Sequence, residues 1–172
     1  LNNAVLVFLE GGSQIFGHST LKTRLRNAFD KYNVNMERQV RYLPHLSPEQ
    51  YQSLNSLGDI ALDTPGWSGG NTTLEALYQN LPLVTLRGDQ MRACVSAGIL
   101  QLIEVEETVA TNKKDYIEIA VRLGKDRNWR QQIAKKISKS RAKLETDMSC
   151  MRAMEDFLEK AVKAAKGSSV TT

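Results

Sequence analysis

The sequence predicts an α/β fold, a Rossmann-like parallel sheet with flanking helices. Short apolar runs that leave no room for a polar face alternate with segments whose apolar residues recur at helical spacing. Strands of a parallel sheet have this composition because helices cover both faces of the sheet. Glycine- and proline-rich turns separate the two kinds of segment. With 172 residues and 41% apolar content, the chain can bury a sizeable core, most simply as one domain with a helical extension.

The first strand–helix–strand unit lies in the N-terminal quarter of the chain. Residues 4–9 are a continuous apolar run that ends at Gly11 and Gly12, where the chain can turn. Apolar residues from about residue 19 to residue 32 then form one helical stripe, and residues 40–43 give a second short strand. A strand, a helix and a second strand in this order predict a right-handed crossover within a parallel sheet.

Three further strands and their helices are expected after this unit. The apolar runs at residues 60–62, 83–86 and 103–105 are too short for a polar face and predict buried strands. The helix before the first of them begins after Ser47, with proline at the first helical position and glutamine where a capping box requires it. The helix over residues 115–123 is stopped by the glycine that follows it.

The C-terminal part of the chain is expected to be helical. Eight basic residues against one acid between residues 125 and 143 would suit a nucleic-acid surface. Apolar residues at helical spacing instead favour a helix whose cations face solvent, and no aromatic residues interleave these cations for stacking on bases, so no nucleic-acid partner is expected. A further apolar stripe, residues 151–162, is interpreted as part of the core.

The stretch from residue 59 to residue 78 combines a buried strand, a glycine-rich loop and a helix. Glycines let a ligand approach the backbone, and the first N–H groups of the helix lack intrahelical partners and carry partial positive charge. This combination predicts an anion site. A capping box between Thr72 and Glu75 is the alternative, since it would satisfy the same N–H groups. Asp63 and Thr64, at the strand end, are expected to brace the loop rather than to catalyse.

Four motifs carry a family resemblance. They are LGDIALDTP at residues 57–65, GGNTTLEAL at 69–77, LPLVTLRG at 81–88 and YIEIAVRLG at 116–124. In this order they resemble the C-terminal catalytic half of the O-GlcNAc transferase family, glycosyltransferase family 41. The resemblance extends weakly over most of the chain, from about residue 4 to about residue 158.

The resemblance implies the fold of one half of a GT-B glycosyltransferase, in which a sugar nucleotide lies between two domains. It implies a UDP-sugar donor, UDP-GlcNAc first, and a protein serine or threonine as acceptor; glucose and GDP-fucose donors stay open. Residues 1–124 would form the nucleotide-sugar-binding domain, residues 125–166 C-terminal helices packing on it, and residues 167–172 a disordered tail. The other catalytic half and upstream tetratricopeptide (TPR) repeats are expected partners in the whole protein.

The substrate-binding residues that the resemblance implies come from two loops. The loop at Leu46 would contact the uracil ring through backbone groups, and Tyr51 would lie near the nucleotide from the first turn of the next helix. The glycine-rich loop and helix start would stabilise the diphosphate, and Glu75 would accept a hydrogen bond from a ribose hydroxyl. The expected set is Leu46, Tyr51, Gly69, Gly70, Asn71, Thr72, Thr73 and Glu75.

No catalytic residue and no metal ligand is assigned to this chain, and no metal cofactor is expected. In the family, the acid/base groups and a lysine that contacts the diphosphate lie upstream of the matching region, so the chain alone is expected to hold nucleotide without turnover. Helix N-termini and backbone N–H groups can stabilise a departing diphosphate without metal. A non-catalytic interaction module on the same fold is the alternative, because Tyr51 and Cys94 stand where family members have histidine and arginine.

Composition sets the remaining expectations. The pI near 9.1 and the net charge of +4 favour anionic ligands only mildly. Two widely separated cysteines, Cys94 and Cys150, fit no metal or redox spacing and favour a reducing, cytoplasmic location. No apolar run reaches the roughly 18 residues that a membrane span needs, so no membrane partner is expected. The chain resembles a fragment, whose unpaired sheet edge and apolar surface would favour a homodimer.

Overall fold

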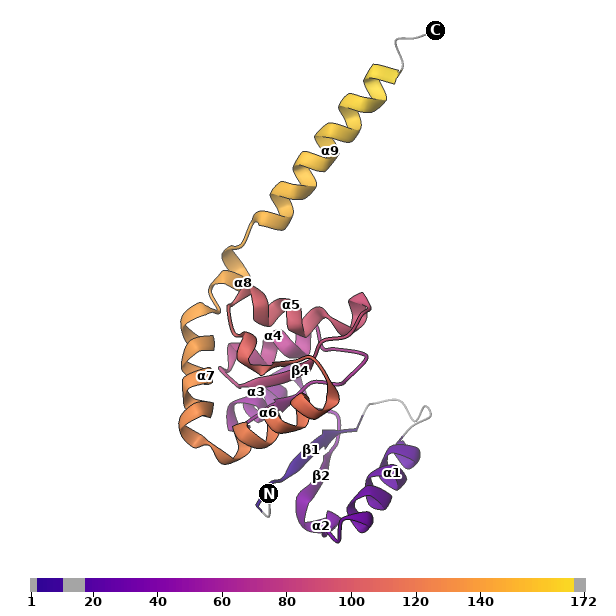
Figure 1. Cartoon of the computed structure of the whole chain (residues 1–172), viewed down its shortest axis with the longest axis vertical. Coiled ribbons are helices and arrows are strands. Elements are labelled where there is room, and N and C mark those ends of the chain that lie inside the picture. The colour runs from indigo at the N-terminus through magenta and orange to yellow at the C-terminus, as the bar shows by residue number, and fades with distance from the viewer. Residues whose placement is uncertain (1–2, 11–17, 169–172) are drawn as a thin grey trace.

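Strands and helices alternate along the described chain, residues 3–10 and 18–168 of a computed structural model (Figure 1). The elements in chain order are β1 Leu6–Leu9, α1 His18–Lys31, α2 Met36–Gln39, β2 Val40–Leu43, α3 Pro48–Leu57, β3 Ala61–Leu62, α4 Asn71–Tyr78, β4 Leu83–Leu86, η1 Met91–Ala93, α5 Val95–Leu102, η2 Glu106–Thr108, β5 Val109–Ala110, α6 Lys113–Lys125, α7 Arg127–Ser140, α8 Lys143–Thr146 and α9 Ser149–Ser168. The elements η1 and η2 are single 3-10 turns. The predicted α/β class, with parallel strands and flanking helices, is confirmed.

Hydrogen bonds join the described strands into two parallel sheets. Strand β1 pairs with β2 over its whole length, from Leu6 opposite Val40 to Leu9 opposite Leu43. In the other sheet, β4 is central and pairs with β3 on one side and β5 on the other. Helical segments connect the strands of each pair, as parallel strands require. The turn expected at residues 11–12 lies outside the described residues.

The strand expected at residues 103–105 is not formed, and this prediction is wrong. Its two apolar residues, Ile103 and Val105, are fully buried, but Glu104 between them has a positive φ of 59° and turns the chain. The Val105 N–H donates to the Leu100 carbonyl over 2.8 Å, so this segment closes the end of α5. The apolar–polar–apolar order of residues 103–105 is the same in a strand and in a turn that buries the residue on each side of it. The sequence pattern therefore could not separate the two. The fifth strand, β5, forms further along the chain.

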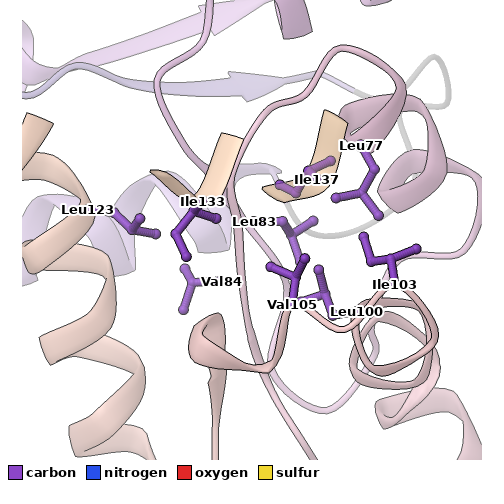
Figure 2. Close-up of a cluster of buried hydrophobic side chains, with 9 residues drawn as sticks. All are labelled: Leu77, Leu83, Val84, Leu100, Ile103, Val105, Leu123, Ile133 and Ile137. Carbon is purple, nitrogen blue, oxygen red and sulfur yellow. The ribbon is translucent and has the colours of Figure 1, made fainter. Parts of the chain in front are cut away.

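One cluster of buried side chains joins the three-stranded sheet to the helices around it (Figure 2). The cluster contains Leu77 of α4, Leu83 and Val84 of β4, Leu100, Ile103 and Val105 at the end of α5, Leu123 of α6, and Ile133 and Ile137 of α7. Each of these side chains is at most 3% exposed, and burial of each contributes roughly 1.5–3 kcal/mol. Two isoleucines one turn apart thus hold α7, while Lys135 and Lys139 of the same helix are exposed.

Helix α9 projects away from the rest of the molecule (Figure 1). After α8, Asp147 takes an extended backbone conformation instead of continuing the helix. The apolar stripe expected in the core is therefore exposed: Met151, Met154, Phe157 and Leu158 are between 52% and 65% exposed. Of the C-terminal helices expected to pack on the domain, α7 does so and α9 does not.

The end of α9 overlaps the segment expected to form a tail. Helix α9 includes residues 167 and 168, the first two residues of the segment expected to be disordered. The helical pattern of α9 extends into these two residues although glycine is a weak helix former. Residues 169–172 lie outside the described residues.

Candidate functional site

An open hollow of about 460 Å³ lies where β3 ends and α4 begins. Its lining comes from α3, β3, the loop between β3 and α4, the first turns of α4 and the start of β4. The lining residues are Tyr51, Asn55, Ala61, Leu62, Asp63, Thr64, Trp67, Ser68, Gly69, Gly70, Asn71, Thr72, Thr73, Ala76 and Leu83. Ligands of parallel α/β proteins bind at the carboxyl ends of the strands, and this hollow has that position.

Six of the eight predicted substrate-binding residues line this hollow. They are Tyr51 of α3 and the five consecutive residues 69–73. The other two, Leu46 and Glu75, are half-buried and are not among its lining residues. Leu46 lies in the loop between β2 and α3, and Glu75 lies one turn inside α4. The structure therefore brings the glycine-rich loop together with Tyr51 and leaves Leu46 outside the hollow.

Helix α4 has no side-chain cap at its start. Gly70 is the N-cap residue, and its carbonyl accepts hydrogen bonds from the Thr73 and Leu74 N–H groups, each at 3.1 Å. A capping box between Thr72 and Glu75 would need Thr72 as the N-cap residue, but the N-cap residue is Gly70, two positions earlier. The alternative interpretation of these residues as a capping box is therefore wrong.

The first N–H groups of α4 remain available to a ligand. Within the described residues, the N–H groups of Asn71 and Thr72 have no hydrogen-bond acceptor. Both residues are exposed on the wall of the hollow. Unpaired N–H groups at a helix start carry partial positive charge and attract anions. The start of α4 is therefore suited to an anionic group such as a phosphate.

Asp63 fixes the glycine-rich loop from its inner side. The residue is 7% exposed; its Oδ1 accepts from the Gly69 N–H at 2.8 Å and its Oδ2 from the Thr85 hydroxyl at 2.6 Å. The Asp63 carbonyl accepts a third hydrogen bond, from the Tyr116 hydroxyl at 2.8 Å. A buried carboxylate whose two oxygens both accept hydrogen bonds from the protein holds the loop backbone in place. The expected bracing of the loop by Asp63 is confirmed.

Tyr116 is a permanent donor in this arrangement. Burial, and to a lesser extent the nearby Asp63 carboxylate, raise the pKa of Tyr116 from 10.0 to about 12. Both effects disfavour the charged phenolate. The hydroxyl therefore keeps its proton, and its hydrogen bond to the loop, at neutral pH.

The other side of the loop is held by η1 and α5. The Ser68 N–H donates to the Arg92 carbonyl at 2.8 Å, and the Ser68 hydroxyl donates to the same carbonyl at 3.2 Å. The Ser96 hydroxyl donates to the Gly69 carbonyl at 3.1 Å and lies 2.7 Å from the Thr73 hydroxyl. Thr73 and Ser96 are at most 1% exposed. Hydrogen bonds within the protein thus fix the loop from both sides.

The two glycines before α4 have different surroundings. A Cβ at Gly69 would lie 2.6 Å from the Oγ1 atoms of both Thr72 and Thr73, closer than real Cβ atoms approach other atoms. A Cβ at Gly70 would meet nothing within 4 Å. Gly69 therefore lets the threonines pack against the loop, and Gly70 leaves the ligand side open.

Tyr51 and Asn55 form the α3 side of the hollow. Burial raises the pKa of the Tyr51 hydroxyl, the approach of the Asn55 side chain lowers it, and the Glu75 carboxylate raises it further. Glu75 thus lies close enough to α3 to act on Tyr51 although it does not line the hollow. Asn55 is 8% exposed, and among the described residues its Nδ2 completes no hydrogen bond. The Asn55 amide therefore lies near enough to the Tyr51 hydroxyl to lower its pKa, but it does not reach full hydrogen-bond geometry.

Asn55 and Trp67 line the hollow, and sequence reasoning did not single them out. Asn55 lies one helical turn after Tyr51, and this spacing points to the same side of α3. Trp67 is 69% exposed in a loop of turn-forming residues, where a large aromatic side chain has no role in the core. The Arg92 guanidinium lies 6.0 Å from the centre of its ring.

Residues 3–10 and 18–168 show neither a metal-binding cluster nor a membrane-spanning helix. No group of three or more histidine, cysteine, aspartate or glutamate side chains in this part of the chain is placed to hold a metal ion. None of its helices is long and apolar enough to cross a bilayer. Cys94 and Cys150 are free thiols, and the Cys94 thiol donates to the Gly88 carbonyl over 2.6 Å.

Comparison with known proteins gives consistent matches. The model of glycosyl transferase family 41 matches residues 18–153. A Petunia hybrida protein, a probable UDP-N-acetylglucosamine–peptide N-acetylglucosaminyltransferase SPINDLY, is 30% identical over 112 residues, 64% of this chain and 12% of that protein. The Caenorhabditis elegans UDP-N-acetylglucosamine–peptide N-acetylglucosaminyltransferase is 35% identical over 78 residues, 45% of this chain and 7% of that protein.

A solved structure agrees with these matches. The structure of a mutant Thermobaculum terrenum O-GlcNAc transferase covers 97% of this chain and 32% of its own, with a TM-score of 0.79 and 27% identity. The chain therefore spans about a third of that structure and 7–12% of the two relatives above. The expected fold, one half of a GT-B glycosyltransferase, is confirmed. Because the family match covers most of the chain, including the hollow and its glycine-rich loop, the chain belongs to glycosyltransferase family 41.

Proposed function

We propose that this chain is the donor-binding part of a protein O-glycosyltransferase. The donor would be a UDP-sugar, with UDP-GlcNAc favoured over other sugars, and the acceptor would be a serine or threonine of another protein. The observation that carries the proposal is the uncapped start of α4, whose Asn71 and Thr72 N–H groups lie on the wall of the hollow. The names of the petunia and nematode relatives, both UDP-N-acetylglucosamine–peptide transferases, support the donor and the acceptor class.

In this proposal the donor diphosphate lies across the start of α4. Negative charge builds on the diphosphate as its bond to the sugar breaks, and N–H groups already aimed at it stabilise that charge. The loop that holds these groups is fixed by Asp63 and Ser96, so little reorganisation accompanies the reaction. Glu75, near Tyr51, would accept a hydrogen bond from the ribose. Groups that transfer protons would come from outside this chain.

The remaining features of the whole protein belong to the same proposal. We expect the diphosphate to bind without a metal cofactor, so that a chelator leaves UDP affinity unchanged. TPR repeats, a second catalytic half, a cytoplasmic location and a homodimer remain predictions. A monomeric mass across micromolar concentrations, measured by analytical ultracentrifugation, would count against the homodimer.

Asn71 offers a direct test of the anion site. Proline lacks an N–H group but is well tolerated at the first position of a helix, so Asn71→Pro removes one proposed phosphate donor and keeps the helix start. Asn71→Ala is the matched control, because it removes the side chain and keeps the N–H. We expect Asn71→Pro to weaken UDP binding about tenfold relative to Asn71→Ala, the size of a lost hydrogen bond to a charged group.

The measurement is calorimetric titration of the purified chain with UDP, with GDP and a short DNA duplex as controls. Thermal unfolding of both variants checks that the fold is kept. Equal UDP affinity of the two variants would show that the Asn71 N–H does not hold the diphosphate. Absence of UDP binding by the unmodified chain would favour the alternative, a non-catalytic module on the same fold.

A further inference from the structure

The Trp67 side chain is exposed, and hydrogen bonds hold the loop that carries it in place. Its neighbours Ser68 and Gly69 are hydrogen-bonded to Arg92 and Asp63, and the Trp67 N–H donates to the Thr64 carbonyl at 3.3 Å. The side chain nevertheless stays 69% exposed and lines the hollow. Single exposed hydrophobic residues are common, but a tryptophan presented by a fixed loop at a ligand site supplies a large, rigid surface for contact.

The hollow has two sides, and α4 lies between them. On one side α3 packs on α4 and contributes Tyr51 and Asn55. On the other side η1 and α5 hold the glycine-rich loop through Ser68 and Ser96, and Trp67 lies on this side beside Arg92. Figure 1 shows the same order, with α4 between α3 and α5. A ligand centred on the start of α4 and long enough to fill the hollow would extend toward α3 at one end and toward Trp67 at the other.

The charges near the hollow distinguish the two ends. The Glu75 carboxylate acts on Tyr51 and therefore belongs to the α3 side, together with the unpaired Asn55 amide. Polar partners of this kind suit a nucleoside, which has hydroxyls and heteroatoms to pair with them. The Trp67 side instead offers the flat face of an indole. A pyranose ring, whose C–H bonds form an apolar face and whose hydroxyls point outward, fits such a surface.

We propose that Trp67 is a specificity-determining residue that stacks on the sugar ring of the donor. This inference rests on the proposed function, because it needs a diphosphate at the start of α4 to set the direction of the ligand. The Arg92 guanidinium lies 6.0 Å from the centre of the indole ring, at the outer limit of a cation–π contact. Trp67 thus contributes to binding of the intact sugar nucleotide and not to binding of the nucleotide alone.

The test compares UDP with UDP-GlcNAc by calorimetric titration of the full chain and its Trp67→Ala variant. We expect the variant to bind UDP within about twofold of the unmodified chain and UDP-GlcNAc about tenfold more weakly, as truncation of a well-placed tryptophan costs. Trp67→Phe should restore most of the UDP-GlcNAc affinity, because it keeps an aromatic face. Thermal unfolding of both variants separates lost contact from lost fold.

Fluorescence gives an independent measurement. The chain has two tryptophans, so Trp129→Phe leaves Trp67 as the single tryptophan, whose emission is excited selectively at wavelengths that tyrosine does not absorb. UDP-GlcNAc should shift or quench this emission, and UDP should do so much less. If the Trp67→Ala variant loses UDP and UDP-GlcNAc affinity equally, or if neither ligand changes the emission while both bind, the inference about Trp67 is overturned and the proposed function stands. If UDP itself does not bind, both are overturned together.

Discussion

Gly69 shows at the scale of one residue why the loop before α4 tolerates little change. Its missing side chain leaves room for two threonine hydroxyls, and each would lie 2.6 Å from a new Cβ. We expect Gly69→Ala to lower the free energy of unfolding by roughly 1–3 kcal/mol, the usual cost of overpacking. Gly70→Ala, which meets no atom within 4 Å, is the matched control and should cost less. Chemical denaturation of the two variants measures the difference.

Tyr116 gives a prediction about pH. Below pH 10 the phenol is protonated in both the folded and the unfolded chain, so its contribution to stability is fully present. The folded chain holds this proton to a pKa of about 12, whereas the unfolded chain loses it near 10.0, so the free energy of unfolding falls between these values.

Tyr116→Phe is the variant that checks this pH dependence. It lacks the ionisable hydroxyl, so its loss of stability between pH 10 and pH 12 should be shallower than in the unmodified chain. It also loses the hydrogen bond to the Asp63 carbonyl and should be slightly less stable at neutral pH. Thermal unfolding across this pH range measures both effects. Parallel curves for the two proteins would contradict the raised pKa.

Local sequence predicts part of the site at this scale. The glycines, the exposed helix start and the position of Asp63 at a strand end follow from patterns a few residues long. The partners of Asp63 do not, because Thr85 lies 22 positions and Tyr116 lies 53 positions along the chain. Asn55 and Trp67 were missed for the same reason: their place at the hollow depends on how α3 and the loop dock.

At the scale of single elements, the residues at a helix start predict a cap correctly in one helix and wrongly in another. The helix start at Ser47 was predicted in full: its side chain accepts from the Gln50 N–H, and the Gln50 side chain accepts from the Ser47 N–H. The same pattern of residues at Thr72 and Glu75 gives no cap, since helix α4 starts earlier. Whether this residue pattern forms a cap depends on where the helix starts. In α4 the backbone conformation of the preceding glycines sets that start, and no local pattern predicts it.

Helix α9 carries a prediction of its own. Every residue from 149 to 166 is exposed, so its removal takes away little packing. We expect a chain truncated after Asp147 to lose helical circular dichroism in proportion to the helix and to keep its thermal midpoint within a few degrees. A Leu100→Ala variant, which opens a cavity at a fully buried position, is the contrasting control and should lower the midpoint clearly. A large fall on truncation would show that α9 packs on the domain in solution.

At the scale of the whole molecule, the fold class was predictable and the division into sheets was not. Alternating strands and helices with short apolar strands define an α/β protein, whatever the exact pairing. The separation of β1 and β2 from the three-stranded sheet depends on hydrogen bonds between distant segments. The exposed position of α9 likewise depends on the chain direction after α8 and not on its apolar stripe, which resembles that of a buried helix.

The hydrogen bond from Tyr116 to the Asp63 carbonyl has a consequence for the order of folding. Strand β3, the loop and helix α4 are synthesised well before α6, so they must wait for a partner 53 positions later. Contacts of this range form slowly, because a long segment must first be closed. The Tyr116 contact is therefore expected to form only after α6 has been made. A stalled chain that ends before α6 would keep the hydrogen bond between Asp63 and the Gly69 N–H and would lack the one from Tyr116.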